Sequence, residues 1–359
     1  MPQDRSLDPS VAAGLPLHTR TLTVEAFHAE GGRLRVEGVI LDLRKCGFVP
    51  TGGELQTAGF IHHMGISLDV DVASARIEAI RTTQPTVAFE ASTLSGGDTC
   101  RDPAPRLGAL VGVPLDAGFV RRLASVFGGP LGCSHLLTLA QLAAASVPRF
   151  LAAERAASGA SEGRSRAPGE RIAKRSLFLD GFERKEGGLE VALQLSEFRT
   201  RPQRDVRHPL DRLAYQHELR LLARVDREIS QIEAIAAVER DASTLAEGAW
   251  HGREDILAGL VGAPALRGFA GRVLGTVGDA PEDAPLRDAL LNLAPGVIQC
   301  LAALSHRLLA HFQGPRADPA RVPRELSVGG YPDSCYMWRS DGPLARARAD
   351  AMRRAEPVS

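Results

Sequence analysis

Two side chains with chemical potential lie one residue apart in the stretch GGPLGCSHLLTL, residues 128–139. Inside a helix, side chains at positions i and i+2 point about 200° apart, so Cys133 and His135 can share a target only in a turn or in a helix's first residues. A helix N-terminus also favours a thiolate. The spacing therefore predicts that Cys133 and His135 act together, whereas the plainer interpretation makes Cys133 a small buried hydrophobe and His135 a solvated side chain.

Three further residues complete the candidate set. Cys100 and Cys335 lie in the irregular segments DTCRDPAP and YPDSCYMW, where no core needs a cysteine and where ligands are commonly presented. His62 precedes a predicted strand, a place where a lone histidine is also often structural. The metal ligands predicted from the sequence are His62, Cys100, Cys133, His135 and Cys335.

Two chemistries are open to these residues. Three or four sulfur and nitrogen ligands suit zinc or iron, and an open coordination position would allow a water to be activated. Without a metal, Cys133 is the candidate nucleophile for acyl or thioester chemistry, with His62 as its base if His135 diverges from the thiol. Glu37, Asp42 and Asp71 occupy polar strand or turn positions; solvation is favoured for them over catalysis, although they can orient a histidine ligand.

The composition excludes several function classes. The chain has 359 residues, of which 44% are hydrophobic, enough for the cores of two domains. Lys and Arg total 43, as do Asp and Glu, so no net field attracts nucleic acid or an anionic membrane. The sequence shows neither a leader nor an uninterrupted run of about 18 apolar residues, and its five scattered cysteines are unlike a disulfide framework. We expect a cytoplasmic protein with reduced thiols and with no nucleic-acid or membrane partner.

An internal repeat is visible at an offset of 155 residues. The segment from Leu17 aligns with the segment from Ile172, and the same offset places His62 opposite His217. After a small slip in register, LVGVPLDAGF matches LVGAPALRGF at six of ten positions. The repeat predicts a gene duplication. The Cys-x-His pair has no counterpart in the second copy, so the chemistry is assigned to the first copy.

Each copy predicts the same order of elements. The segments LTVEAF and LRVEGVILDL flank an acid-Gly-Gly turn and predict a β-hairpin, and MGISLDV and ARIEAIRTT predict a second hairpin around residues 71–74. Three helices are expected: a short one that ends near Leu110, one that spans about residues 116–127 and one that spans about residues 134–156. The predicted fold class is α+β: two tandem copies of an antiparallel sheet of two hairpins, each followed by helices packed on one face.

The predicted domain organisation has four parts. Residues 1–154 form the first copy, which carries the Cys/His site. Residues 155–171 form a flexible linker, because RAASGASEGRSRAPGE is small, polar and rich in Gly and Ser. Residues 172–314 form a degenerate second copy. Residues 315–359 form a C-terminal tail, which can return to the first copy.

The landmarks around the candidate residues resemble a bacterial family called domain of unknown function 2889 (DUF2889). The segments that carry the resemblance are HHM from His62, Cys100 ahead of APRLGALVG, GCSHL from Gly132 and CYMWRSDG from Cys335. The family's landmarks read H-D-M, C-P, G-C-T-H-L and C-H-A-L followed by D-G. The chain departs from them at His63, where the family has an acid, and at Tyr336, where it has a histidine. The resemblance implies no particular reaction.

A second resemblance concerns the order of elements. Iron-sulfur scaffold proteins of the NifU type also run hairpin strands, a cysteine after the last strand, helices, and a His-Cys pair that opens the last long helix. By analogy, this resemblance implies that His62, Cys100 and the pair of Cys133 and His135 converge.

The sequence thus predicts a metal-binding accessory or carrier protein with zinc or iron at a Cys/His site. The alternatives are a cysteine- or metal-dependent enzyme acting on an acyl or small organic substrate, and a structural subunit whose duplication mimics a homodimer. An open coordination position or a pocket beside Cys133 favours the enzyme, a closed set of four ligands favours the carrier, and no approach of His62 to Cys133 favours the structural subunit. The arginines of PLARARADAMRRAEP can dock on an acidic protein partner, although such runs are usually solvated.

Overall fold

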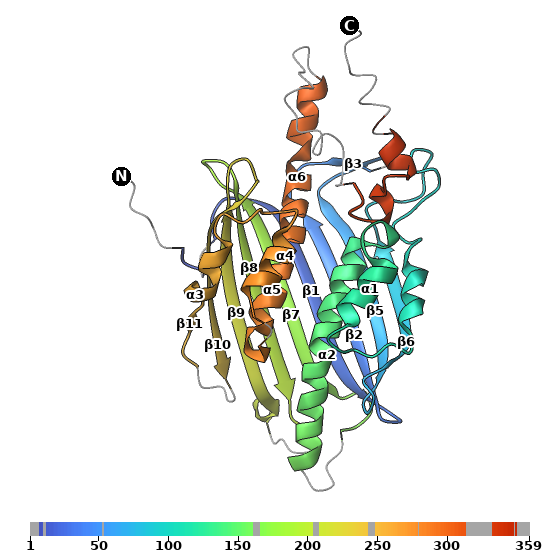
Figure 1. Ribbon diagram of the computed structural model, residues 1–359, viewed down its shortest axis with the longest axis vertical. Helices are drawn as coiled ribbons and strands as arrows, with labels where there is room; N and C mark the ends of the chain where they lie inside the picture. The colour runs from blue at the N-terminus through green and yellow to red at the C-terminus, as the bar shows by residue number, and fades with distance from the viewer. Residues whose placement is uncertain are drawn as a thin grey trace. The chain divides into compact units, whose positions relative to one another are not determined.

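The computed structural model describes residues 7–9, 12–51, 54–160, 166–203, 208–242, 248–278, 280–313, 332–347 and 349. The chain divides into two compact units, whose helices and strands are labelled in Figure 1. The first unit comprises Met1–Val36 with Ala145–Cys300, and the second comprises Glu37–Ala144 with Leu301–Ser359. The fold is mixed, with a large antiparallel sheet and several helices, as the α+β prediction requires.

The sheet of the first unit has the strand order β11-β10-β9-β8-β7-β1. Its strands are β1 (Leu15–Ala29), β7 (Arg171–Glu183), β8 (Leu189–Thr200), β9 (Leu213–Val225), β10 (Ile232–Ala242) and β11 (His251–Gly252). β1 and β7 pair antiparallel, with Leu22 opposite Leu177. This pairing of strands so far apart in the chain was not predicted from the sequence.

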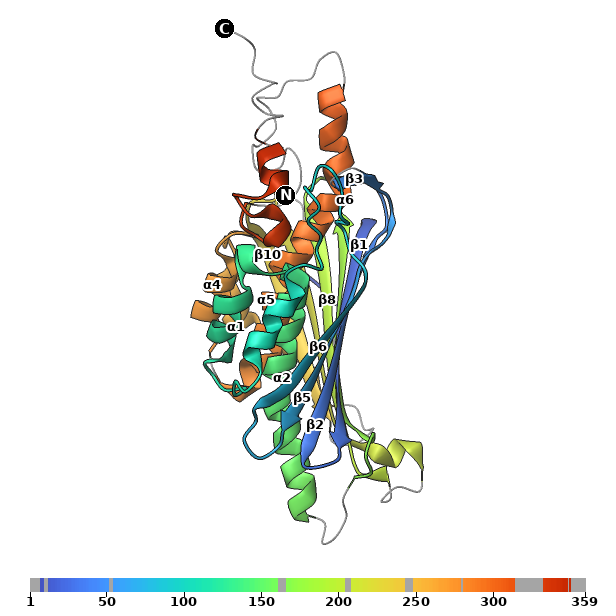
Figure 2. The same cartoon turned by 90° about the vertical axis from the view of Figure 1, so that its right-hand side faces the viewer.

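Helices of the first unit pack on one face of this sheet (Figure 2). They are α3 (Glu254–Leu257), α4 (Phe269–Thr276), α5 (Ala284–Leu291) and the first part of α6 (Leu293–Gln313). Glycine allows α6 to approach β7, because a β-carbon at Gly181 would lie 2.0 Å from Sγ of Cys300. Cys300 is buried, as expected for a cysteine of the core.

The second unit contains the strands that position the candidate site. Residues 37–44 of β2 (Arg33–Arg44) neighbour β5 (Gly59–Asp71), and β5 pairs antiparallel with β6 (Ile77–Thr86). The second predicted hairpin is confirmed by this pairing. A short hairpin of β3 (Val49–Thr51) and β4 (Glu54–Gln56) was not predicted.

The helices of the second unit follow the predicted order. They are the 3-10 helices η1 (Ala104–Leu110), η2 (Gly129–Leu131) and η8 (Tyr336–Trp338), the α-helix α1 (Phe119–Phe127) and the first part of α2 (Ser134–Ala160). The predicted helix positions are confirmed for η1, α1 and α2 to within a few residues. The start of α2 at Ser134 places Cys133 and His135 at its N-terminus.

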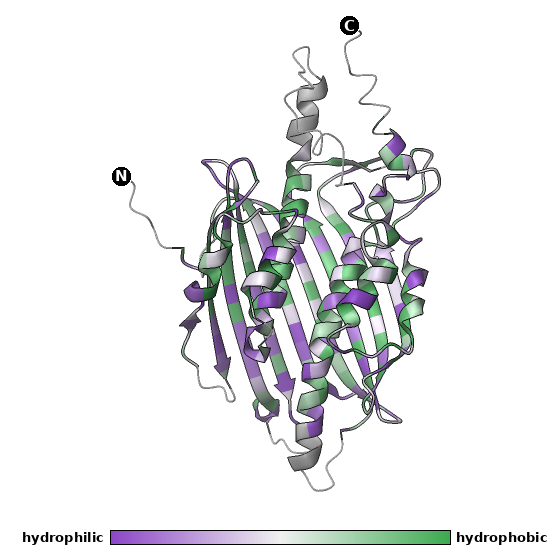
Figure 3. Cartoon of the chain, viewed as in Figure 1, coloured by the Kyte–Doolittle hydropathy of each residue, from purple (hydrophilic) through white to green (hydrophobic). Residues whose placement is uncertain are grey.

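Hydrophobic and hydrophilic residues both occur along the strands (Figure 3), and their alternation decides which side chains enter the core. In β2, Leu34, Val36 and Ile40 are buried, while Arg35 and Glu37 between them are exposed. Successive strand residues point to opposite faces. Any polar residue in phase with the buried positions is therefore carried into the core.

Two helical stretches, Ser134–Arg155 and Pro281–Ser305, are long and apolar enough to cross a membrane on length and composition alone. Core helices of soluble proteins pass the same test, and 56% and 50% of the two apolar windows are buried within the protein. These helices are therefore weak evidence for a membrane, and the absence of a membrane partner stays a prediction.

The compact units divide the chain at other points than the predicted domain boundaries. β1 belongs to the first unit because it pairs with β7 along most of its length. Of the predicted linker, residues 161–165 lie outside the described residues, whereas Arg166 is buried and forms an ion pair with Glu154 at 2.7 Å. Residues 315–331 of the predicted tail, and most of its arginines, also lie outside the described residues.

Candidate metal centre

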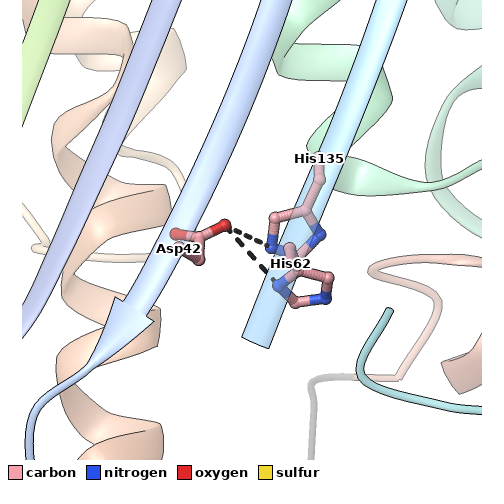
Figure 4. Close-up of side chains that lie close together, drawn as sticks. All are labelled: Asp42, His62 and His135. Atoms are coloured by element: carbon pink, nitrogen blue, oxygen red, sulfur yellow. Dashed lines mark ion pairs between the residues drawn. The ribbon is translucent and has the colours of Figure 1, made fainter. Parts of the chain in front are cut away.

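Asp42, His62 and His135 converge in the second unit (Figure 4). Asp42 comes from β2, His62 from β5 and His135 from the first turn of α2. One ligand atom of each side chain lies within 4.8 Å of those of the other two, and all three residues are buried. Among the residues that the structure describes, no other group of three or more His, Cys, Asp or Glu side chains meets this condition.

The strand period brings Asp42 and His62 to the buried face. Asp42 is in phase with the buried Val36 and Ile40 of β2. His62 is in phase with the buried Met64 of β5, whereas His63 between them is exposed. Two neighbouring strands therefore supply the carboxylate and one imidazole on a single face of the sheet.

The turn before α2 aims the second imidazole. A β-carbon at Gly132 would lie 2.0 Å from the carbonyl oxygen of Phe127, so the turn requires glycine at this position. The carbonyl oxygen of Cys133 accepts a hydrogen bond from the backbone N–H of Leu137 at 2.9 Å, which makes Cys133 the first residue of the helical hydrogen-bonding pattern. His135 thus lies in the first helical turn, directed at the sheet.

Both imidazoles face the same carboxylate oxygen. Nδ1 of His62 lies 3.5 Å from Oδ2 of Asp42, and Nε2 of His135 lies 3.3 Å from it (Figure 4). The two rings stack with their centroids 3.6 Å apart and an interplanar angle of 29°. Charge-assisted N–H to carboxylate hydrogen bonds are shorter, about 2.7–2.9 Å. The group is therefore more open than a tight hydrogen-bonded triad.

Arg44 adds a positive charge close to Asp42. It lies on the same face of β2, is buried, and donates a hydrogen bond from Nη1 to the carbonyl oxygen of Gln56 at 3.0 Å. Burial lowers the pKa of Arg44 to about 10, although negative charge on Cys46 and on Asp42 raises it in part. The Asp42 carboxylate thus lies in a buried environment with an arginine as well as two imidazoles.

Cys133 lies near Nδ1 of His135, the ring nitrogen that does not face Asp42. Its Sγ is 3.9 Å from Nδ1 of His135 and 3.8 Å from Sδ of Met64. The separation from His135 agrees with the expectation that side chains at positions 133 and 135 can meet where a turn opens a helix. His135 does not diverge from the thiol, so the reason for preferring His62 as the base of Cys133 does not hold.

The two remaining predicted ligands lie near Cys133 without joining the histidine group. The backbone N–H of Tyr336 donates to the carbonyl oxygen of Gly132 at 2.8 Å, which sets Cys335 beside Cys133. Burial raises the pKa of the Cys100 thiol, and negative charge on Cys133 and then on Cys335 raises it further.

Asp42 is the member of this group that the sequence analysis undervalued. Solvation was favoured for Glu37, Asp42 and Asp71. Glu37 is exposed, and Asp71 accepts hydrogen bonds from the backbone and the hydroxyl of Ser74 in the turn after β5. Asp42 is fully buried, so that interpretation is wrong for it. Its phase with Val36 and Ile40 was the signal in the sequence.

A different buried carboxylate occupies the matching place in the first unit. Glu197 lies 155 residues after Asp42. Its carboxylate lies 3.1 Å from Arg149, 3.6 Å from Arg175 and 2.8 Å from Arg199. Arg175 also pairs with Asp288 at 2.6 Å. His217, the residue 155 positions after His62, lies 3.3 Å from Glu239 instead.

One family model matches part of the chain. Residues 18–147 match the model of a family described as Protein of unknown function (DUF2889). The match contains Asp42, His62 and His135, and it supports the resemblance seen in the sequence. No curated protein and no solved structure was found to match the chain.

Proposed function

We propose that this protein binds one zinc or iron ion through Asp42, His62 and His135. The observation that carries the proposal is the spacing of the three ligand atoms. In tetrahedral coordination, two ligand atoms that are each about 2.1 Å from an ion lie about 3.4 Å from one another. The separations of the Asp42 oxygen from the two ring nitrogens are 3.3 and 3.5 Å.

The donor set favours zinc or iron over the harder cations. Two imidazoles with one carboxylate occur in catalytic zinc sites and in non-haem iron sites, whereas calcium and magnesium prefer oxygen ligands. The second nitrogen of a ligating histidine normally meets an outer partner that fixes the ring. Nδ1 of His135 has such a neighbour in Cys133, at 3.9 Å.

The proposed metal ion has two alternative roles. The protein is an accessory or carrier protein in the first, and a metal-dependent enzyme in the second. Three side chains leave a tetrahedral ion one further position, which is the arrangement of catalytic rather than structural zinc sites. An ion held in this way would supply Lewis acidity to a water or to a substrate oxygen. The three-residue set therefore favours an enzyme more than the five predicted ligands did.

A cysteine-dependent enzyme is supported by a separate observation. Cys133, His135 and Asp42 lie in the order nucleophile, base and orienting acid, with separations of 3.9 and 3.3 Å. Incubation with an activated thioester, followed by intact-mass analysis, tests this role. An acyl adduct that is absent from Cys133→Ser supports it, and an unmodified wild-type protein contradicts it.

We also propose that the chain arose by duplication and forms a pseudo-dimer. Support comes from the pairing of β1 with β7, in which Leu22 lies opposite Leu177, its counterpart at the offset of 155. A two-fold interface pairs equivalent residues in this way. The NifU-like scaffold role would be one use of the first copy, with the second copy retained as a mate.

Elemental analysis of the full chain, purified anaerobically without chelator, tests the metal proposal. We expect about one equivalent of zinc or iron in the wild type and in the control His217→Gln, and at least a tenfold loss in His62→Gln. The control changes the histidine at the matching place of the first unit, which lies beside Glu239. Wild-type protein that stays metal-free after reconstitution, or equal metal in His62→Gln, would contradict the proposal.

A further inference from the structure

Cys133 lies close to the sulfur of Met64 and to Nδ1 of His135, the ring nitrogen that does not face Asp42. Sγ of Cys133 lies 3.8 Å from Sδ of Met64 and 3.9 Å from Nδ1 of His135. Met64 is fully buried, Cys133 is 6% exposed and His135 is 9% exposed. A thiol, a thioether and an imidazole nitrogen therefore meet in a buried environment.

Two further thiols border this group. Cys335 is set beside Cys133 by the hydrogen bond from the backbone N–H of Tyr336 to the carbonyl oxygen of Gly132. Cys100 is buried, and its backbone N–H donates to the carbonyl oxygen of Phe89 at 3.1 Å. Cys133 and Cys335 thus lie on segments that are far apart in the sequence and are joined by the first of these backbone hydrogen bonds.

The C-terminal segment that carries Cys335 is held by several contacts. The ring of Trp338 packs edge-on against Phe89, with centroids 5.7 Å apart. Arg339 pairs with Asp98 at 2.6 Å. Both partners lie in the loop that carries Cys100, so these contacts hold the segment of Cys335 against that loop.

The spacing of the donors fits a three-coordinate ion. With bonds of about 2.3 Å to sulfur and about 2.1 Å to nitrogen, trigonal coordination separates the donor atoms by about 3.8 to 4.0 Å. The two separations at Cys133 are 3.8 and 3.9 Å. Both separations at Cys133 therefore agree with three-coordinate geometry.

The thioether selects the kind of ion. Zinc in proteins takes cysteine, histidine and carboxylate ligands, whereas soft thiolate and thioether donors together select Cu(I). None of these three donors is a carboxylate, whereas the group of Asp42, His62 and His135 contains one. Met64 is thus the residue that distinguishes this group from a zinc site.

We propose that Cys133, Met64 and Nδ1 of His135 form a second metal site that binds Cu(I), with Cys100 and Cys335 as bordering thiols. The site uses different donor atoms from the Asp42 centre, because Nε2 of His135 faces Asp42 while Nδ1 faces Cys133. The imidazole of His135 joins the two sites. The Cu(I) site does not need the Asp42 centre to hold an ion.

A competition experiment with Cu(I) tests the proposal. The full-length apo protein is titrated anaerobically with Cu(I) against bathocuproine disulfonate, a chelator whose copper complex is coloured. We expect about one equivalent bound by the wild type. Cys133→Ser should remove binding, and Met64→Leu should weaken it by more than the roughly 10–100-fold that loss of an outer partner costs. Leucine nearly conserves the volume of methionine, so the fold is expected to survive, which circular dichroism checks.

Two controls separate this site from the Asp42 centre. Asp42→Asn should lose zinc while weakening Cu(I) by no more than the roughly 10–100-fold that loss of an outer partner of His135 costs, and Met64→Leu should weaken Cu(I) by more than this while keeping zinc. Cys46→Ser, at a half-buried cysteine without a place in the group, should leave Cu(I) affinity unchanged. Equal Cu(I) affinity in Met64→Leu, or loss of Cu(I) in Asp42→Asn, would overturn the proposal.

X-ray absorption of the copper-loaded wild type gives an independent test that needs no variant. We expect sulfur neighbours with one imidazole around the copper. A shell of nitrogen and oxygen alone would overturn the proposal, even if the stoichiometry were correct.

Discussion

Two buried carboxylates that lie 155 residues apart in the sequence have opposite neighbours. Asp42, in the second unit, faces His62 and His135. Glu197, in the first unit, faces Arg149, Arg175 and Arg199. Both carboxylates are fully buried.

The two sets of neighbours differ in whether they can bind a metal ion. A neutral imidazole carries a lone pair that can bind a metal, whereas an arginine keeps its proton and has no acceptor. The network around Glu197 is therefore permanently neutralised by cations of the chain itself. The group around Asp42 can exchange its internal contacts for an ion. Glu197 thus lies in a closed network of ion pairs, whereas the group around Asp42 contains side chains that are able to bind a metal ion.

Removing the charge of Glu197 should have the largest effect on stability. Glu197→Gln leaves Arg175 buried with less compensation, and breaking a buried ion pair by removing one partner costs about 3–5 kcal/mol. Urea unfolding of the full chain measures the loss. Metal content should be unchanged, because the variant does not touch the Asp42 centre. A loss below about 1 kcal/mol would show that the network contributes little.

Replacing the glycine in the turn before α2 should have the next largest effect on stability. Gly132→Ala places a methyl group where the Phe127 carbonyl oxygen lies, and overpacking of this kind typically costs about 1–3 kcal/mol. Zinc affinity should fall as well, because the turn positions His135. The control Gly271→Ala lies in α4 with open space around its β-carbon and should stabilise the protein by about 0.5–1 kcal/mol. Unchanged zinc affinity in Gly132→Ala would contradict the positioning role of the turn.

Acid should reduce the contribution of Glu197. Burial opposes its charge, but Arg175, Arg149 and Arg199 more than offset burial and hold the pKa of this carboxyl below its usual value. A carboxyl with a lowered folded-state pKa stabilises the protein above its unfolded pKa of about 4.3, and the contribution is lost as the pH falls through the folded value. The stability difference between wild type and Glu197→Gln should therefore shrink below about pH 4.3. Urea midpoints at several pH values measure this trend, and a difference that does not change with pH would refute it.

Changing His217 should have the smallest effect. Its Nε2 lies 3.3 Å from Glu239, which keeps Arg253 as a partner when the histidine is replaced. His217→Gln should change the free energy of unfolding by about 1 kcal/mol or less, the usual net value of one hydrogen bond. Chemical denaturation gives the value. A loss of several kcal/mol would mean that His217 holds its own network together, as Glu197 does.

The sequence predicted the local elements better than their long-range partners. The hairpin of β5 and β6 and the helices η1, α1 and α2 follow from alternation and from helical periodicity, which are local properties. The pairing of β1 with β7 joins segments more than 140 residues apart, and no local signal specifies such a pairing. The compact units therefore have other boundaries than the domains predicted from the internal repeat and the Gly/Ser-rich linker.

For the candidate site, the sequence identified His62, Cys133 and His135 by residue type and spacing. It gave too little weight to Asp42, because an acid on a strand is usually solvated. The buried phase of Val36 and Ile40 carries the missing information. The orientation of the His135 ring decides which ring nitrogen faces Asp42 and which faces Cys133. Residue spacing in the sequence does not fix this orientation.

The most direct test of the account is the shift in melting temperature on adding zinc to the metal-free full chain. An ion that binds the folded state stabilises it by about 2.7 kcal/mol at a free concentration of 100 times Kd. We predict a clear upward shift for the wild type and for Glu197→Gln, and no shift for Asp42→Asn. A shift in Asp42→Asn as large as that of the wild type would contradict the claim that Asp42, rather than its counterpart Glu197, serves a metal ion.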